Sequence, residues 1–140
     1  GIVHGDYSLT NVMIGKNDPN VIAILDWELS TLGDPCADFN YHCLQYTMNP
    51  KLADKEYCKN QGIPVIDDYV KMYSEKIEID LSEEWDLYSA YNLFKLAGIL
   101  QGILGRVRDG TAAHENAAER ASGVRNLSDK AWDLVEKNFL

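Results

Sequence analysis

The 140 residues are enough for one small domain with a core of its own, and 46% hydrophobic with 25% charged residues is the composition of an ordinary globular protein. Thirteen basic against 22 acidic residues leave a net charge of −9, which argues against a nucleic-acid or anionic-membrane partner, because both need a basic face. The longest apolar stretch, residues 88–104, contains Asn92, Lys95 and Gln101 and is shorter than the roughly 20 apolar residues of a membrane span.

The first third of the chain is predicted to contain a short β-region. Residues 1–3 end a strand or connector that leads into a loop at residues 4–6. Residues 12–14 and 21–25 predict the two strands of a hairpin, because the six residues between them are rich in turn formers. The second strand is apolar on both faces, so we expect it to be covered.

The rest of the chain is predicted to be helical. Asp34 and Pro35 are a strong start signal, with the aspartate as N-cap and the proline at the first helical position. Ser82 is the expected cap of a long helix, whose last turn carries Arg106 and Arg108. The expected helices cover residues 35–46, 53–60, 67–76, 83–108 and 124–138. The predicted fold class is therefore α+β, predominantly helical: one hairpin followed by four or five helices.

The three cysteines indicate a cellular compartment but no metal site. Cys36, Cys43 and Cys58 are odd in number and form no C-x-x-C pair, and no ligands stand at the spacing of a zinc site. Reduced, buried thiols are the expectation. They favour an intracellular location, which is the cytoplasm or, in a eukaryote, an organelle such as the mitochondrion or peroxisome.

Three polar residues at a characteristic spacing carry the functional signal. Asp6 lies in the first loop, Asn11 follows five positions later, and Asp26 comes directly after the second predicted strand. In kinases one carboxylate orients the substrate hydroxyl, while an amide and a second carboxylate hold Mg²⁺ on the phosphates of ATP. The spacing matches H-R-D-x-x-x-x-N, although Gly5 stands where that motif has arginine. Pairing of the hairpin would place Asn11 and Asp26 at neighbouring strand ends.

The joint occurrence of H-G-D-x-x-x-x-N, a hairpin, I-L-D-W-E and L-G-D-P-x-x-D resembles the aminoglycoside phosphotransferase and choline kinase-like superfamily. Residues 23–35, 62–64 and 95–102 are most similar to the branch of kinase-like domains associated with acyl-CoA dehydrogenases. The resemblance implies that residues 1–140 are the C-terminal lobe of a protein-kinase-like fold, with the catalytic loop and hairpin followed by a helical bundle. It also implies that the N-terminal nucleotide lobe is absent, so we expect this fragment alone to be inactive.

The resemblance implies a role for each matching residue. Asp6 matches the catalytic aspartate, Asn11 the metal-binding amide, and Asp26 the aspartate that binds the metal and the nucleotide, so ATP and Mg²⁺ are the implied cofactors. His4 is expected to brace the loop through hydrogen bonds. Asp38, one turn into the first helix, is expected to hydrogen-bond back to that loop.

Four further residues have weaker assignments. Glu28 is either a solvated acid or an outer partner of the metal. Asp34 is expected to support the site only as a helix cap. Arg106 and Arg108 could meet an anionic acceptor such as a CoA phosphate, although arginines at this position more often complement a helix C-terminus.

The sequence therefore predicts ATP- and Mg-dependent phosphoryl transfer to a hydroxyl of a small molecule by the full-length parent. The branch suggests a hydroxyacyl-CoA acceptor, and the wider superfamily suggests choline or an aminoglycoside. Ser8 and Thr10 stand where the branch often has arginine and aspartate, which leaves the acceptor preference open. The alternative is a non-catalytic kinase-like binding domain. Other implied partners are the missing N-terminal lobe and a fused or associated acyl-CoA dehydrogenase.

Overall fold

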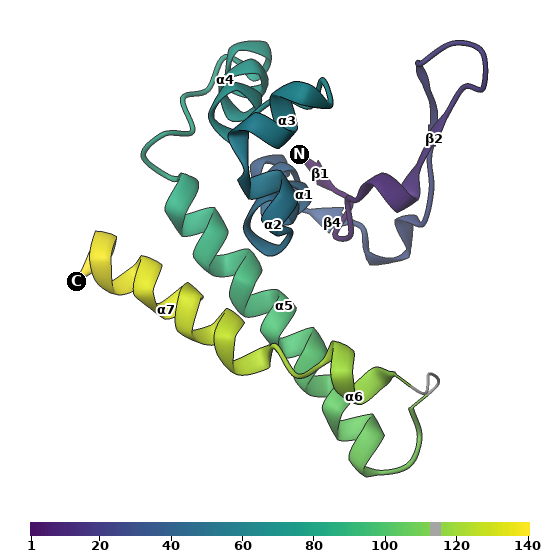
Figure 1. Cartoon of the computed structure of the whole chain (residues 1–140), viewed down its shortest axis with the longest axis vertical. Helices are drawn as coiled ribbons and strands as arrows, with labels where there is room; N and C mark the ends of the chain where they lie inside the picture. The colour runs from purple at the N-terminus through teal and green to yellow at the C-terminus, as the bar shows by residue number, and fades with distance from the viewer. Residues whose placement is uncertain (113–115) are drawn as a thin grey trace. The chain divides into compact units, whose positions relative to one another are not determined.

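The computed structural model describes residues 1–112 and 116–140, which divide into two compact units, Gly1–Glu83 and Glu84–Leu140. The first unit holds a small β-region and helices α1 to α4, and the second holds α5 to α7 (Figure 1). This is the predominantly helical α+β architecture that the sequence predicted.

The β-region consists of two antiparallel pairs. Strand β1 (Ile2–Val3) pairs with β4 (Thr31–Leu32), and β2 (Val12–Ile14) pairs with β3 (Val21–Ile24). Two short 3₁₀ helices follow the loop and the hairpin, η1 (Leu9–Asn11) and η2 (Trp27–Leu29). The hairpin and a strand within residues 1–3 agree with the prediction, whereas β4 and its pairing with β1 were not foreseen, because the two residues of β4 are too few to give a strand signal.

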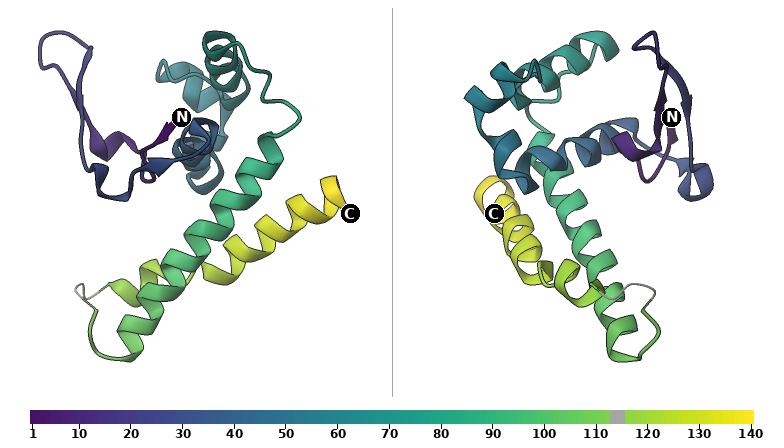
Figure 2. Two further views of the ribbon diagram at one scale, coloured as in Figure 1. Left: turned by 180° about the vertical axis from the view of Figure 1, so that it is seen from behind. Right: turned by 45° about the vertical axis from the view of Figure 1, so that its right-hand side comes forward.

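The expectation that the second hairpin strand is covered is wrong for the described chain. Val21 and Ile22 of β3 are 57% and 63% exposed, and Met13 and Ile14 of the partner strand are exposed too. Both views in Figure 2 show the β2–β3 hairpin extending away from the helices of its unit. The strand forms as predicted, but burial of its side chains depends on elements that the described residues do not supply.

Four helices complete the first unit: α1 (Pro35–Met48), α2 (Pro50–Ala53), α3 (Lys55–Asn60) and α4 (Ile66–Ile77). Asp34 caps α1 by accepting a hydrogen bond from the backbone nitrogen of Cys36 at 2.9 Å. Asp54 caps α3 in the same way, so α3 begins two residues later than the helix expected at residues 53–60. The short α2 was not predicted. The ring of Phe39 stacks on Tyr73 of α4, with centroids 3.8 Å apart, and ties α4 to α1.

The second unit contains α5 (Trp85–Arg108), α6 (Ala117–Arg120) and α7 (Val124–Phe139). Helices α5 and α7 pack side by side (Figure 2). The two helices carry small and branched residues that are buried: Leu93, Ala97, Leu127 and Ala131. The short α6 was not predicted.

The predicted cap of α5 is wrong. The backbone nitrogen of Ser82 donates to Asp80, and α5 begins later, at Trp85, with Glu84 at its N-cap and no side-chain cap. The other end agrees with the prediction, since α5 ends at Arg108 and Gly110 follows with a φ of 72°. Serine is a common N-cap, but here the backbone of Ser82 belongs to a turn that the side chain of Asp80 stabilises, ahead of the helix.

All three cysteines are buried free thiols, as expected. Among the helices of residues 1–112 and 116–140, none combines the length and the apolar character needed to cross a membrane.

Candidate active site

The loop that carries Asp6 has a backbone that only glycine fits at its second position. Gly5 has a φ of 86°, in the left-handed region that side chains rarely adopt. A Cβ atom built on it would lie 2.5 Å from the carbonyl oxygen of Leu29 in η2. The close approach of η2 therefore explains why this chain has glycine where H-R-D motifs have arginine.

His4 braces this loop from inside the protein. Its side chain is buried, with 3% of its surface exposed, and its ring lies 4.7 Å from that of Trp27. Nδ1 accepts a hydrogen bond from the backbone nitrogen of Asp6 at 3.2 Å, so Nε2 carries the proton and donates to the carbonyl of Leu25 at 2.8 Å. With both ring nitrogens engaged in this way, His4 links the Asp6 loop to the segment just before Asp26.

Asp38 of α1 holds the same loop from the other side. Its carboxylate accepts hydrogen bonds from two consecutive backbone nitrogens, that of His4 and, at 3.0 Å, that of Gly5. Hydrogen bonds to an ionised acceptor are the stronger kind. Asp34, at the start of the same helix, serves as its N-cap.

Asn11 joins the loop to the hairpin. Its amide nitrogen donates to the backbone carbonyl of Asp6 at 3.0 Å and to the Asp6 carboxylate at 3.3 Å. Its own backbone carbonyl accepts from the nitrogen of Leu25 at 2.8 Å, next to Asp26. In the pairing of β2 with β3, Val12 is opposite Ile24, so Asn11 and Asp26 lie at neighbouring strand ends. The bonds from Asn11 connect this end of the hairpin to Asp6.

Asp26 stands exposed at the head of η2 in the left-handed conformation, with φ 66° and ψ 55°. Aspartate and asparagine tolerate this region better than other side chains. Outliers of this kind cluster at functional sites. Within the described residues, neither the Asp26 carboxylate nor the amide oxygen of Asn11 takes part in a hydrogen bond or ion pair.

These two oxygens suit a magnesium ion. Mg²⁺ prefers oxygen ligands and is held by one or two protein groups together with water and phosphate oxygens. Within residues 1–112 and 116–140 no group of three or more His, Cys, Asp or Glu side chains could hold a metal by itself. An ion at Asn11 and Asp26 would therefore take most of its ligands from a nucleotide and from water.

Sequence reasoning missed three residues of α1 and the loop that surround Asp6. The hydroxyl of Tyr41 donates a hydrogen bond to the Asp6 carboxylate, and burial followed by the charge and hydrogen bond of Asp6 raises the pKa of Tyr41 to about 12. The ring of Tyr7 lies 5.6 Å from that of His42. Burial lowers the pKa of His42. The available signal was helical spacing, because positions 41 and 42 share a face with Asp38.

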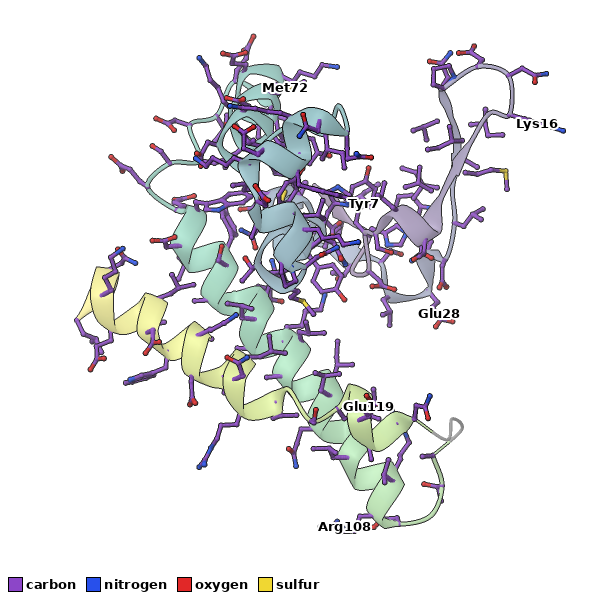
Figure 3. The ribbon with its side chains drawn as sticks, in the orientation of Figure 1. Tyr7, Lys16, Glu28, Met72, Arg108 and Glu119 are labelled. Atoms are coloured by element: carbon purple, nitrogen blue, oxygen red, sulfur yellow. The ribbon has the colours of Figure 1, made fainter. Side chains whose placement is uncertain are left out.

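Three predicted residues remain: Glu28, Arg106 and Arg108. Glu28 is exposed on η2 and its side chain points away from the loop (Figure 3). Arg106 and Arg108 lie on the last turn of α5, in the second unit, where the side chain of Arg108 meets Asp109 at 3.4 Å. A shallow depression of about 470 Å³ opens elsewhere in the first unit, between α4 and the segment after it, and contains none of these residues.

Comparisons with known proteins match this description. The model of the phosphotransferase enzyme family matches residues 1–91. The chain is 36% identical to acyl-CoA dehydrogenase family member 10 of Mus musculus, over 97% of this chain and 13% of that protein. It is 32% identical to acyl-CoA dehydrogenase family member 11 of Homo sapiens, over 99% of this chain and 18% of that protein.

A solved structure adds the fold. The crystal structure of a candidate aminoglycoside phosphotransferase from Ralstonia eutropha JMP134 is similar, with a TM-score of 0.88 and 39% identity. The match covers 99% of this chain and 43% of the solved one. The chain thus spans less than half of that protein and less than a fifth of the two acyl-CoA dehydrogenase family members.

Proposed function

Because the chain belongs to the phosphotransferase enzyme family, we propose that the full-length protein transfers the γ-phosphoryl group of ATP to a hydroxyl of a small molecule, with Mg²⁺ as the metal. One observation carries the proposal. Asp6 is held through its backbone nitrogen by His4 and through its carbonyl and carboxylate oxygens by Asn11, while the side-chain oxygen atoms of Asn11 and Asp26 have no partner among the described residues.

In the proposed reaction Asp6 accepts a hydrogen bond from the acceptor hydroxyl and orients its oxygen toward the γ-phosphorus. The new O–P bond forms as the bond to the bridging oxygen of ADP breaks, and the hydroxyl proton passes to Asp6. The transition state is loose, so orientation contributes more than base strength. Asn11 and Asp26 would hold Mg²⁺, which offsets the charge on the phosphate oxygens when it is bound.

For the acceptor we propose a hydroxyacyl-CoA. The support is the similarity to acyl-CoA dehydrogenase family members 10 and 11, whose names imply acyl-CoA chemistry in the same polypeptide. The similarity to a candidate aminoglycoside phosphotransferase supports an aminoglycoside or amino alcohol instead. A panel of 3-hydroxybutyryl-CoA, choline and kanamycin, each with Mg-ATP, separates these acceptor classes.

The test uses the full-length protein and three single substitutions. Asp6→Asn should remove nearly all turnover and preserve Mg-ATP binding in calorimetry, because Asp6 faces the acceptor. Asp26→Asn should weaken metal-dependent nucleotide binding while remaining compatible with the left-handed backbone. Asp68→Asn, an exposed aspartate of α4, is the matched control and should change neither.

Two outcomes would contradict the proposal. Equal binding of Mg-ATP by wild type and Asp26→Asn would refute the metal role of Asp26. Nucleotide binding without turnover on any acceptor would favour the non-catalytic binding domain.

A further inference from the structure

Helix α1 presents one face to the catalytic loop. Asp38, Tyr41 and His42 are spaced three and four positions apart, so they lie on the same side of the helix. Asp38 binds the loop backbone at His4 and Gly5, and His42 packs against the ring of Tyr7. Tyr41 therefore lies on the face of α1 that contacts the loop on both sides of Asp6.

Tyr41 brings this face of α1 into contact with the reacting carboxylate. Its hydroxyl donates a hydrogen bond to the Asp6 side chain, and its own side chain is partly buried. The amide of Asn11 is the second donor to that carboxylate, at 3.3 Å. An ionised carboxylate offers roughly four lone-pair sites, so these two donors leave room for an acceptor hydroxyl.

We propose that Tyr41 is a positioning residue for phosphoryl transfer: together with Asn11 it fixes the rotation of the Asp6 carboxylate, so that the unused oxygen lone pairs face the acceptor hydroxyl. The inference rests on the proposed function. A misplacement of about 1 Å at a reacting group costs on the order of a hundredfold in rate. A partly buried phenol is stiffer than a flexible polar side chain and is suited to setting such an orientation, because it has only two side-chain torsions.

A different role for the same contact makes the opposite prediction. If the Tyr41 hydroxyl merely occupied the place of the acceptor hydroxyl, its removal would lower the KM for the acceptor and leave kcat unchanged or higher. If it positions Asp6, removal lowers kcat and leaves the KM for ATP unchanged.

The experiment compares Tyr41→Phe with Tyr46→Phe in the full-length protein, using Mg-ATP with 3-hydroxybutyryl-CoA, choline and kanamycin. Tyr46 is on the same helix, but its hydroxyl donates to the carbonyl of Pro64 at 2.8 Å, so the control removes a similar group from a different partner. We expect kcat to fall about tenfold to a hundredfold for Tyr41→Phe, the loss typical of a hydrogen bond to a charged group, and to stay within about twofold of wild type for Tyr46→Phe.

A double-mutant cycle tests whether Tyr41 acts through Asp6. In an Asp6→Asn background, Tyr41→Phe should lower the residual rate much less than it does in wild type. The denaturation midpoints of the same variants should also be non-additive, and more so than those of Tyr46→Phe combined with Asp6→Asn. Equal rate losses in both backgrounds, or additive midpoints, would overturn the inference.

The failures of the two proposals can be distinguished. An active wild type with an equally active Tyr41→Phe variant overturns the role of Tyr41 alone. A wild type that transfers phosphate to none of the three acceptors overturns the proposed function, and with it any role of Tyr41 in that reaction.

Discussion

Removal of the Asp38 carboxylate should release the loop that carries Asp6. Asp38→Ala deletes the acceptor of two backbone N–H groups, those of His4 and Gly5, and the side chain of His4 is buried. A hydrogen bond to a charged group contributes about 1.5–3 kcal/mol, and a buried donor without a partner costs about 1–3 kcal/mol. With partial access of water to the second donor, we expect unfolding to become easier by about 3 kcal/mol.

Asp34→Ala is the matched control. It removes a carboxylate from the start of the same helix, but that carboxylate caps the backbone of α1. The loss of an N-cap costs about 1 kcal/mol. The two variants therefore separate the attachment of the loop from the stability of the helix.

Urea denaturation of the 140-residue chain, followed by tryptophan fluorescence, measures the difference. The ring of Trp27 lies 4.7 Å from that of His4 and reports on the loop. The other tryptophans, Trp85 and Trp132, are replaced by phenylalanine in all samples. Equal losses of stability in Asp38→Ala and Asp34→Ala would refute the reasoning, because the hydrogen bonds from the loop to Asp38 would then stabilise the fold no more than the N-cap bond of Asp34 does. In the full-length protein Asp38→Ala should also lower kcat more than Asp34→Ala does.

Three further predictions follow from the same contacts. Gly5→Ala should destabilise the chain by at least about 2 kcal/mol more than Gly62→Ala, since both glycines have positive φ but only Gly5 meets a backbone oxygen at 2.5 Å; equal denaturation midpoints would contradict the clash. His42 has its pKa lowered from 6.5 by burial, so its contribution to stability is full above about 6.5 and declines as the pH falls, because the unfolded chain binds the proton more readily. His42→Gln should reduce the change of the denaturation midpoint with pH between about pH 7.5 and about pH 5.5. An unchanged pH dependence would exclude His42 as the cause of that change. Replacement of both Arg106 and Arg108 by alanine should raise the KM for 3-hydroxybutyryl-CoA and preserve the KM for ATP. If neither KM changes, the two arginines only complement the C-terminal end of α5.

Local signals in the sequence determined most of the elements. The start of α1 followed from Asp34 and Pro35, and the hairpin from two strand-forming runs around a polar turn. These signals act through residues that are neighbours in the chain, so they can be recognised without the fold. The family followed from motif spelling, and the matching family model agrees. The roles given to Asp6, Asn11 and Asp26 stay predictions.

Only the tertiary structure decided how the candidate site is held. The bonds of Asp38 to the loop, across 34 and 33 positions, were expected, but the two backbone nitrogens that donate them were not. The bond from Tyr41 to Asp6, across 35 positions, was not predicted at all. No local pattern specifies such contacts, because they depend on the path by which β4 returns beside β1 and delivers α1 to the loop. The start of α5 at Trp85 was missed for the same reason. Whether a strand is covered, and which residue caps a helix, depend on what the rest of the chain places beside them.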